Sequence, residues 1–214
     1  MATDEGQRAI GGFSRRSVLR GGLLAGAGVA TMGAMSAVLT GTAKATDNPQ
    51  TGWGYCHYCA TMFWVAGAAT SACEGSPNLR HNAASGSYNY GLINSQPGLN
   101  NNSKPQPNWR WCAPCQGLFW GGFGGVCFAA SAPGEPHVAG GTSYDLYFNE
   151  PGNLGVTTNP QAYWRWCIFC SLLYWQGPSG QSAGVCPAQP FGVGSAHYDN
   201  DSGTNYITDW YGTH

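Results

Sequence analysis

Nine cysteines fall into three groups of three, and this arrangement constrains the fold more than any other feature of the sequence. In each group a Cys-x-x-Cys pair is followed, after 13, 11 or 15 intervening residues, by a third cysteine. The pairs begin at Cys56, Cys112 and Cys167, which are 56 and 55 residues apart. A constant period of this length is typical of modular repeats. We therefore expect three copies of one structural unit.

Aromatic residues keep the same register as the cysteines. Eight of the nine tryptophans occupy equivalent positions: Trp53, Trp109 and Trp164 before the pairs, Trp111 and Trp166 (Tyr55 in the first repeat) directly before them, and Trp64, Trp120 and Trp175 after them. Each repeat then has one histidine after its third cysteine and a later tyrosine, namely His81, His137 and His197 with Tyr88, Tyr144 and Tyr206. The repeats span approximately residues 51–95, 107–150 and 162–210, joined by links rich in Gly, Pro and Asn.

The sequence predicts an all-β fold. Aromatic residues alternate with Arg or Gly before each cysteine pair, a period of two that indicates a half-buried strand. The Leu-Phe-Trp triplet, the Gly-Val-Cys segment and the stretch around the late tyrosine give about four short strands per repeat. Three such units suggest a pseudo-threefold, β-trefoil-like arrangement. The alternative is three zinc-ribbon-like units in tandem, in which the tryptophans would not meet in one core.

The first 45 residues have the pattern of an export signal. Arg15 and Arg16 precede an uncharged segment, Gly21 to Ala43, and a small-x-small motif ends at Ala45. This pattern resembles a twin-arginine (Tat) signal peptide. An uncleaved membrane anchor is the alternative, which the glycines and the cleavage motif disfavour. We expect cleavage after Ala45, a mature domain of residues 46–214 in the cell envelope or secreted, and membrane contact only through the signal.

The charge of the mature region excludes one class of partner. Residues 46–214 contain four basic and eight acidic residues, a net charge of −4 with neutral histidines. Four scattered basic residues cannot neutralise a track of phosphates, so nucleic acid is not an expected partner. The remaining polar residues are mainly Asn, Ser, Thr, Gln, Gly and Tyr. This composition is compatible with binding a neutral polymer such as a cell-wall or other extracellular glycan.

Two chemistries compete for the cysteines. Disulfides are the usual expectation for an exported protein, but an odd number per repeat cannot pair completely. The other interpretation is three Cys₃His zinc sites, in which the Cys-x-x-Cys turn supplies two ligands and a later Cys and His complete a tetrahedron. The predicted ligand sets are Cys56, Cys59, Cys73 and His81; Cys112, Cys115, Cys127 and His137; and Cys167, Cys170, Cys186 and His197. With four protein ligands these would be structural sites.

The pattern Trp-Arg-Trp-Cys-x-x-Cys, completed by a later Val-Cys, His and Ser-x-x-Tyr, resembles a tandem repeat of secreted actinobacterial proteins. Trp109-Arg110-Trp111-Cys112 and Trp164-Arg165-Trp166-Cys167 carry the motif fully, whereas the first repeat has Gly54 and Tyr55 in place of Arg and Trp. The resemblance implies no reaction. We therefore predict a non-enzymatic binding or surface-interaction module. The alternative is an extracytoplasmic thiol–disulfide redox enzyme using the Cys-x-x-Cys pairs, although no thioredoxin-like pattern surrounds them.

Overall fold

The structure is a computed structural model in which the chain divides into two compact units, Met1–Ala43 and Lys44–His214. It describes residues 49–84, 87–94, 105–131, 134–149, 159–180, 183–188, 195–199 and 204–214, all in the second unit. Arg15, Arg16 and Ala45 of the predicted signal lie outside these residues, as does most of both inter-repeat links. Within the described ranges, no helix is long and apolar enough to cross a membrane.

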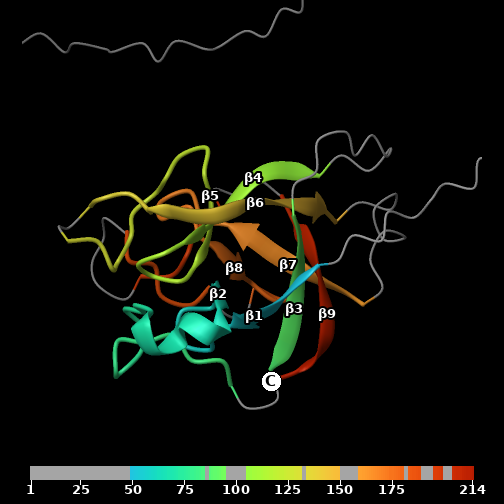
Figure 1. Ribbon diagram of the computed structural model, residues 1–214, viewed down its shortest axis with the longest axis horizontal. Coiled ribbons are helices and arrows are strands. Elements are labelled where there is room, and N and C mark those ends of the chain that lie inside the picture. Colours follow the sequence, from blue (N-terminus) through green and yellow to red (C-terminus); the bar gives the residue numbers. More distant parts are fainter. Residues whose placement is uncertain are drawn as a thin grey trace, which may run out of the picture. The chain divides into compact units, whose positions relative to one another are not determined.

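Nine strands form the described fold, three from each repeat (Figure 1). The first repeat contributes β1 (Gln50–Tyr55), β2 (Met62–Trp64), a short 3₁₀ helix η1 (Val65–Thr70) and β3 (Tyr88–Asn94). The second contributes β4 (Gln106–Cys112), β5 (Leu118–Trp120) and β6 (Ala139–Phe148). The third contributes β7 (Pro160–Trp166), β8 (Leu173–Trp175) and β9 (Tyr206–Thr213). The prediction of an all-β fold built from three repeats is confirmed.

Each repeat pairs its strands in the same register. The first two strands form an antiparallel hairpin across the Cys-x-x-Cys turn, which places Trp53 opposite Trp64, Trp109 opposite Trp120 and Trp164 opposite Trp175. The expected strand at Gly-Val-Cys is wrong, because these residues form no strand. There the backbone N–H of the third cysteine donates instead to a carbonyl two residues before the histidine, at Leu79, Glu135 or Ser195 (2.8–3.0 Å).

Hydrogen bonds join the three repeats into a ring. Trp64 N–H donates to the Gln116 carbonyl at 2.9 Å, Trp120 N–H to that of Ser171 at 2.9 Å, and Trp175 N–H to that of Ala60 at 2.8 Å. The three acceptor residues follow the Cys-x-x-Cys pairs and share a left-handed conformation, with φ between 61° and 68°. The third strands also pair in turn, β3 with β6, β6 with β9 and β9 with β3. The arrangement is therefore pseudo-threefold, as predicted.

One aromatic core lies at the centre of this ring. Each fully buried tryptophan meets the tyrosine of the next repeat edge to face, with ring centroids 5.2–5.4 Å apart: Trp53 with Tyr144, Trp109 with Tyr206, and Trp164 with Tyr90. Such pairs add about 0.5–1.5 kcal/mol each to the free energy gained by burial. Because the tryptophans share one core, the alternative of separate zinc-ribbon-like units is excluded.

The core corrects the alignment of the first repeat. Tyr90, not Tyr88, is the counterpart of Tyr144 and Tyr206, since it lies opposite Trp53 as they lie opposite Trp109 and Trp164. Each core tyrosine donates its hydroxyl hydrogen to a glutamine placed six residues before a Cys-x-x-Cys pair: Tyr144 to Gln50 at 2.6 Å, Tyr90 to Gln161 at 2.5 Å, and Tyr206 to Gln106. This glutamine was not among the predicted site residues, although its distance in sequence from the cysteine pair is the same in all three repeats.

The aromatic residue directly before each cysteine pair is less buried than the tryptophan two positions earlier. Trp109 is fully buried, whereas Trp111 is half-buried and packs against the edge of the core. Tyr55 and Trp166 lie in the same way. Alternation alone would put both aromatic residues on one inner face, but in β4 an irregularity in the pairing with β6, between Arg110 and Trp111, shifts the register between the two tryptophans.

Candidate metal centres

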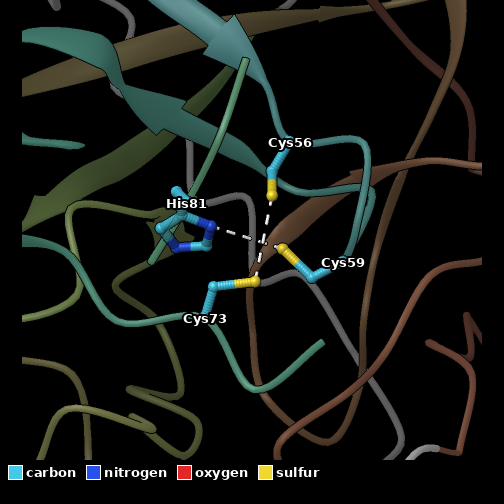
Figure 2. Close-up of side chains that lie close together, drawn as sticks. All are labelled: Cys56, Cys59, Cys73 and His81. Atoms are coloured by element: carbon cyan, nitrogen blue, oxygen red, sulfur yellow. Dashed lines mark hydrogen bonds between the residues drawn. The ribbon is translucent and has the colours of Figure 1, made fainter. Parts of the chain in front are cut away.

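Three clusters each bring three thiols and one imidazole together. Their members are Cys56, Cys59, Cys73 and His81; Cys112, Cys115, Cys127 and His137; and Cys167, Cys170, Cys186 and His197. The potential ligand atoms of each cluster lie within 4.8 Å of one another. Figure 2 shows the first cluster, in which the four side chains point toward one another. All twelve residues are buried, none more than 7% exposed. The structure thus assembles every residue of the three predicted ligand sets and keeps the sets separate.

The distances within the clusters match a tetrahedral site. The Sγ atoms of the first and third cysteines lie 3.8, 3.7 and 3.6 Å apart in the three repeats. The Sγ of the second cysteine lies 3.4, 3.5 and 3.4 Å from the histidine Nδ1. Ideal zinc bonds of about 2.3 Å to sulfur and 2.05 Å to nitrogen place tetrahedral ligands about 3.8 and 3.6 Å apart. Each cluster could therefore hold a metal ion.

None of the nine cysteines forms a disulfide. A disulfide needs sulfur atoms about 2.05 Å apart, and the close pairs Cys56–Cys73, Cys112–Cys127 and Cys167–Cys186 are well beyond that distance. The geometry agrees with the metal-binding interpretation of the cysteines and not with the disulfide interpretation.

The Cys-x-x-Cys turn has one structure in all three repeats. Its first cysteine donates from the backbone to a carbonyl five residues later, as Cys112 N–H does to Gly117 at 2.9 Å. The same cysteine accepts from the residue four positions later, as Cys112 does from Gln116 N–H at 2.8 Å. These paired bonds make the tight turn that directs two thiols toward one point. The equivalent bonds start from Cys56 and Cys167.

Each histidine is fixed by a stacked ring. The imidazoles of His81, His137 and His197 stack on Phe63, Phe119 and Tyr174, with centroids 4.7–4.9 Å apart. In two repeats the distal nitrogen reaches the next repeat: His137 Nε2 donates to the Cys170 carbonyl at 2.9 Å, and His197 Nε2 to that of Cys59 at 3.0 Å. This bond selects the tautomer that leaves Nδ1 facing the thiols, the usual second-sphere arrangement of a metal-bound histidine.

The first repeat lacks this link. His81 Nε2 is buried and has no hydrogen-bond partner among the described residues. In the other repeats the close approach depends on Gly125 and Gly184, where an added Cβ would lie 2.1 Å from the Cys170 or Cys59 carbonyl oxygen. The equivalent position in the first repeat is Ser71, whose Oγ instead accepts from His81 N–H at 2.9 Å. A cavity of about 10 Å³ lined by His81 and Cys115 lies at the missing contact.

The electrostatics of the clusters favour a bound cation. Hydrogen bonds from Cys59 and Cys73 place the pKa of Cys56 far below its usual range, while the hydrogen bond to Cys56 raises the pKa of Cys73 to about 12. Burial lowers the pKa of His137, but hydrogen bonds to Cys112 and Cys127 outweigh it and raise this pKa to about 9. The thiols of one cluster thus do not ionise alike. A divalent cation would stabilise all three as thiolates.

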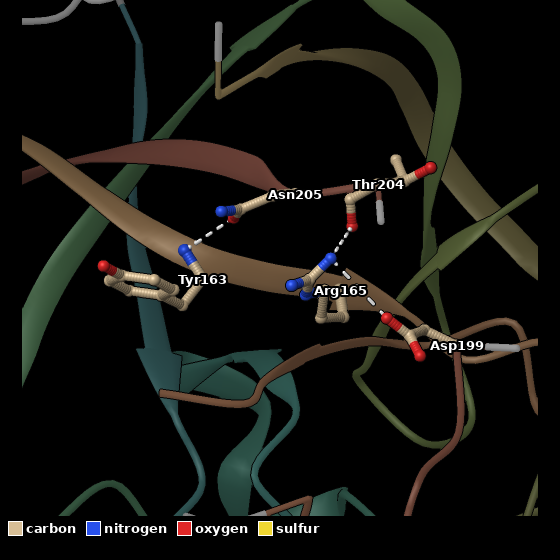
Figure 3. Close-up of polar contacts among 5 residues, drawn as sticks. All are labelled: Tyr163, Arg165, Asp199, Thr204 and Asn205. Atoms are coloured by element: carbon tan, nitrogen blue, oxygen red, sulfur yellow. Dashed lines mark hydrogen bonds and ion pairs between the residues drawn. The ribbon is translucent and has the colours of Figure 1, made fainter. Parts of the chain in front are cut away.

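Arg165 of the repeat motif anchors the chain beyond the third cluster. Its Nη1 donates to the Thr204 carbonyl at 2.9 Å and lies 3.6 Å from Oδ2 of Asp199 (Figure 3). Asp199 follows the predicted ligand His197 by two residues. In the same view, Asn205 Oδ1 accepts from Tyr163 N–H, at 2.7 Å. Tyr163 has a φ of 71°. These contacts hold Asp199, Thr204 and Asn205 against Tyr163 and Arg165 of β7.

Two histidines, His57 and His214, lie outside the clusters. His57 is exposed and its ring is tilted against that of Tyr58, while His214 Nε2 lies 3.2 Å from the Trp53 carbonyl oxygen. No protein-family profile matches this chain, and comparisons with curated proteins and with solved structures found no significant similarity to any of them.

Proposed function

We propose that this protein is an exported, non-enzymatic binding module, built around three structural zinc ions, that recognises a neutral glycan outside the cytoplasm. The observation that carries the proposal is the threefold set of buried Cys₃His clusters. Three thiolates and an imidazole suit zinc, because soft sulfur ligands and tetrahedral geometry favour it over hard cations such as Mg²⁺ or Ca²⁺.

A structural role follows from the ligand count and from burial. Four protein ligands complete a tetrahedral zinc site, so no position is left for a substrate or an activated water. The thiols are also at most 4% exposed. Thiol–disulfide exchange needs a thiolate that can reach another sulfur, and this burial argues against the redox alternative.

The glycan assignment is supported by the surface composition. The mature region has few charges and many tyrosines, asparagines and hydroxyl side chains. Two aromatic rings among the exposed ones are Tyr88 and Phe123, the latter at 72%. Aromatic faces beside neutral hydrogen-bonding groups suit the apolar faces and hydroxyls of sugar rings. Three similar units would also allow weak contacts with a repeating polymer to add.

Metal content and glycan binding together test the proposal. Mature protein folded in the cytoplasm should contain three zinc ions per chain by elemental analysis, and it should be retained by insoluble wall polysaccharide. Metal-free protein with disulfides would overturn the zinc assignment. Turnover of a disulfide substrate that Cys112→Ser abolishes would favour the redox enzyme instead.

A further inference from the structure

A pocket lies where the third repeat meets the first, away from the metal-ligand residues. It has a volume of about 170 Å³ and is lined by Tyr55, Ser87, Tyr88, Tyr90, Gln161 and Trp175. These residues belong to β1, β3, β7 and β8 or, for Ser87, directly precede β3. We propose that this pocket is a binding site for one neutral pyranose ring of a glycan. The inference rests on the proposed glycan-binding function and assigns that function to this pocket.

The size of the pocket fits a single six-membered ring. A cavity of about 150 Å³ is large enough to hold benzene, so 170 Å³ accommodates one ring of that size. Three aromatic side chains supply apolar walls: Tyr55 and Trp175 meet edge to face at 5.7 Å, and Tyr88 stacks on Trp210 at 4.7 Å. The stacked neighbour fixes the Tyr88 ring before any ligand arrives, which reduces the entropy lost on binding.

Polar groups in the wall match the hydroxyls of a sugar. Gln161 Oε1 accepts from the Tyr90 hydroxyl, which leaves its amide N–H groups to donate to a ligand. Ser87, which directly precedes β3, is a second polar residue in the lining of the pocket.

The pocket selects against charged ligands. No Asp, Glu, Lys, Arg or His is among the described residues that line it. Burial raises the pKa of Tyr90 far above its ordinary value, so its phenol is uncharged at neutral pH. An anionic or cationic ligand would lose hydration here without gaining a counter-charge. A neutral saccharide loses far less.

The departure of the first repeat from the motif explains why the pocket forms at this junction. Tyr55 stands where the other repeats have Trp111 and Trp166. At the junction of the second and third repeats, the equivalent pair is Trp120 and Trp166, and Phe123 lies against both rings at 5.5 and 5.7 Å. A larger ring and an additional phenyl group therefore occupy, at the junction of the second and third repeats, the space that stays open beside Tyr55 at the junction of the third and first repeats.

Threefold symmetry supplies matched variants for the test. Tyr55→Trp introduces the residue that the other repeats use and fills the pocket, while Trp111→Tyr makes the reverse change elsewhere. Gln161→Ala and Gln106→Ala each remove one hydrogen bond to a core tyrosine, but only Gln161 lines the pocket. Tyr88→Ala removes an exposed ring of the wall, with the exposed Tyr211→Ala as its control.

The zinc-loaded mature protein and each variant are titrated calorimetrically with neutral hexoses, pentoses, N-acetylhexosamines and their short oligomers. Tyr55→Trp and Tyr88→Ala should each weaken binding at least about tenfold, and Gln161→Ala by about tenfold. The three controls should bind like the parent protein. Variants are compared only where they retain the zinc content and unfolding temperature of their controls.

The outcomes distinguish failure of the pocket assignment from failure of the glycan-binding function. Saccharide binding by the parent protein that Tyr55→Trp, Tyr88→Ala and Gln161→Ala all leave unchanged would overturn the pocket while the glycan-binding function stands. A parent protein that carries its zinc yet binds no saccharide would overturn both.

Discussion

His197 Nε2 donates a hydrogen bond to the backbone carbonyl of Cys59, so a candidate metal ligand of the third repeat is held by one of the first. His137 makes the same bond to Cys170 and thereby links the second repeat to the third. The stability of one cluster is thus coupled to the backbone of the next. The coupling is interrupted only between His81 and Cys115, where the first repeat lacks the glycine.

The zinc assignment predicts a stepwise loss of metal. His197→Ala should reduce the zinc content from three ions to two and destabilise the fold, because a structural thiolate site contributes its binding free energy to folding. His57→Ala, an exposed residue outside the clusters, should retain all three. Elemental analysis with thermal unfolding measures both effects. Equal zinc content in the two variants would contradict the assigned ligand set.

Because His81 lacks the hydrogen bond between repeats that His137 makes, replacing these two histidines should destabilise the fold by different amounts. His137→Ala removes a ligand and also leaves the Cys170 carbonyl without its donor, whereas His81→Ala removes a ligand alone. The free energy of unfolding should therefore fall further for His137→Ala, by about 1 kcal/mol. Chemical denaturation of the two variants, each lacking one zinc, tests this difference. A larger loss for His81→Ala would show that the link does not stabilise the fold.

Gly125 and Gly184 should tolerate no side chain. Alanine at either position would bring its Cβ to 2.1 Å from a backbone carbonyl oxygen, at a positive φ, and should cost about 3–5 kcal/mol of stability. Gly180 provides the control, since it shares a positive φ but has nothing within 4 Å of the added Cβ. Gly180→Ala should cost only about 1–2 kcal/mol. Similar unfolding temperatures for Gly184→Ala and Gly180→Ala would mean that the repeats approach less closely.

The core predicts different costs for neighbouring tryptophans. Trp109→Ala empties a fully buried position in the shared aromatic core and should cost about 3–5 kcal/mol. Trp111→Ala removes a half-buried ring at the core edge and should cost about 1–2 kcal/mol. Equilibrium denaturation of both variants checks the order. The reverse order would mean that the inner face of β4 has been assigned to the wrong residues.

The Tat assignment predicts that export depends on Arg15 and Arg16, which lie outside the described part of the chain. Replacing Arg15 and Arg16 together by lysine should stop export, because the arginine pair is the recognised element of a Tat signal. N-terminal sequencing of exported wild-type protein should begin at Thr46. Undiminished export of the double variant would remove the Tat assignment.

The Cys₃His clusters and the hairpins could be predicted because both depend on local spacing. A Cys-x-x-Cys turn brings Cys112 close to Cys115 in any hairpin, and the alternation around Arg110 indicates a strand without reference to other repeats. Cys127 and His137 were placed by the persistence of residue type across three repeats. Their loops vary in length because only their ends are fixed.

The contacts between repeats could not be predicted in the same way. Nothing near Gly184 in the sequence indicates that it must lie against the Cys59 carbonyl, since the two residues are far apart in the chain. Gln50, Gln106 and Gln161 did carry a readable signal, a constant six-residue offset from the cysteine pairs. The absence of a Gly-Val-Cys strand has a different cause, because the third cysteine donates to a loop carbonyl of its own repeat, two residues before the histidine, and no periodic pattern marks that contact.

The bond from Trp175 N–H to the Ala60 carbonyl has a consequence for the order of events during synthesis. The N-terminal repeat cannot satisfy its own backbone until the C-terminal repeat has left the ribosome, so the ring closes only on a finished chain. Partial chains would expose strand edges. Circular permutants that begin at the second repeat should close the same ring, because equivalent hydrogen bonds join every pair of repeats whichever repeat comes first in the chain.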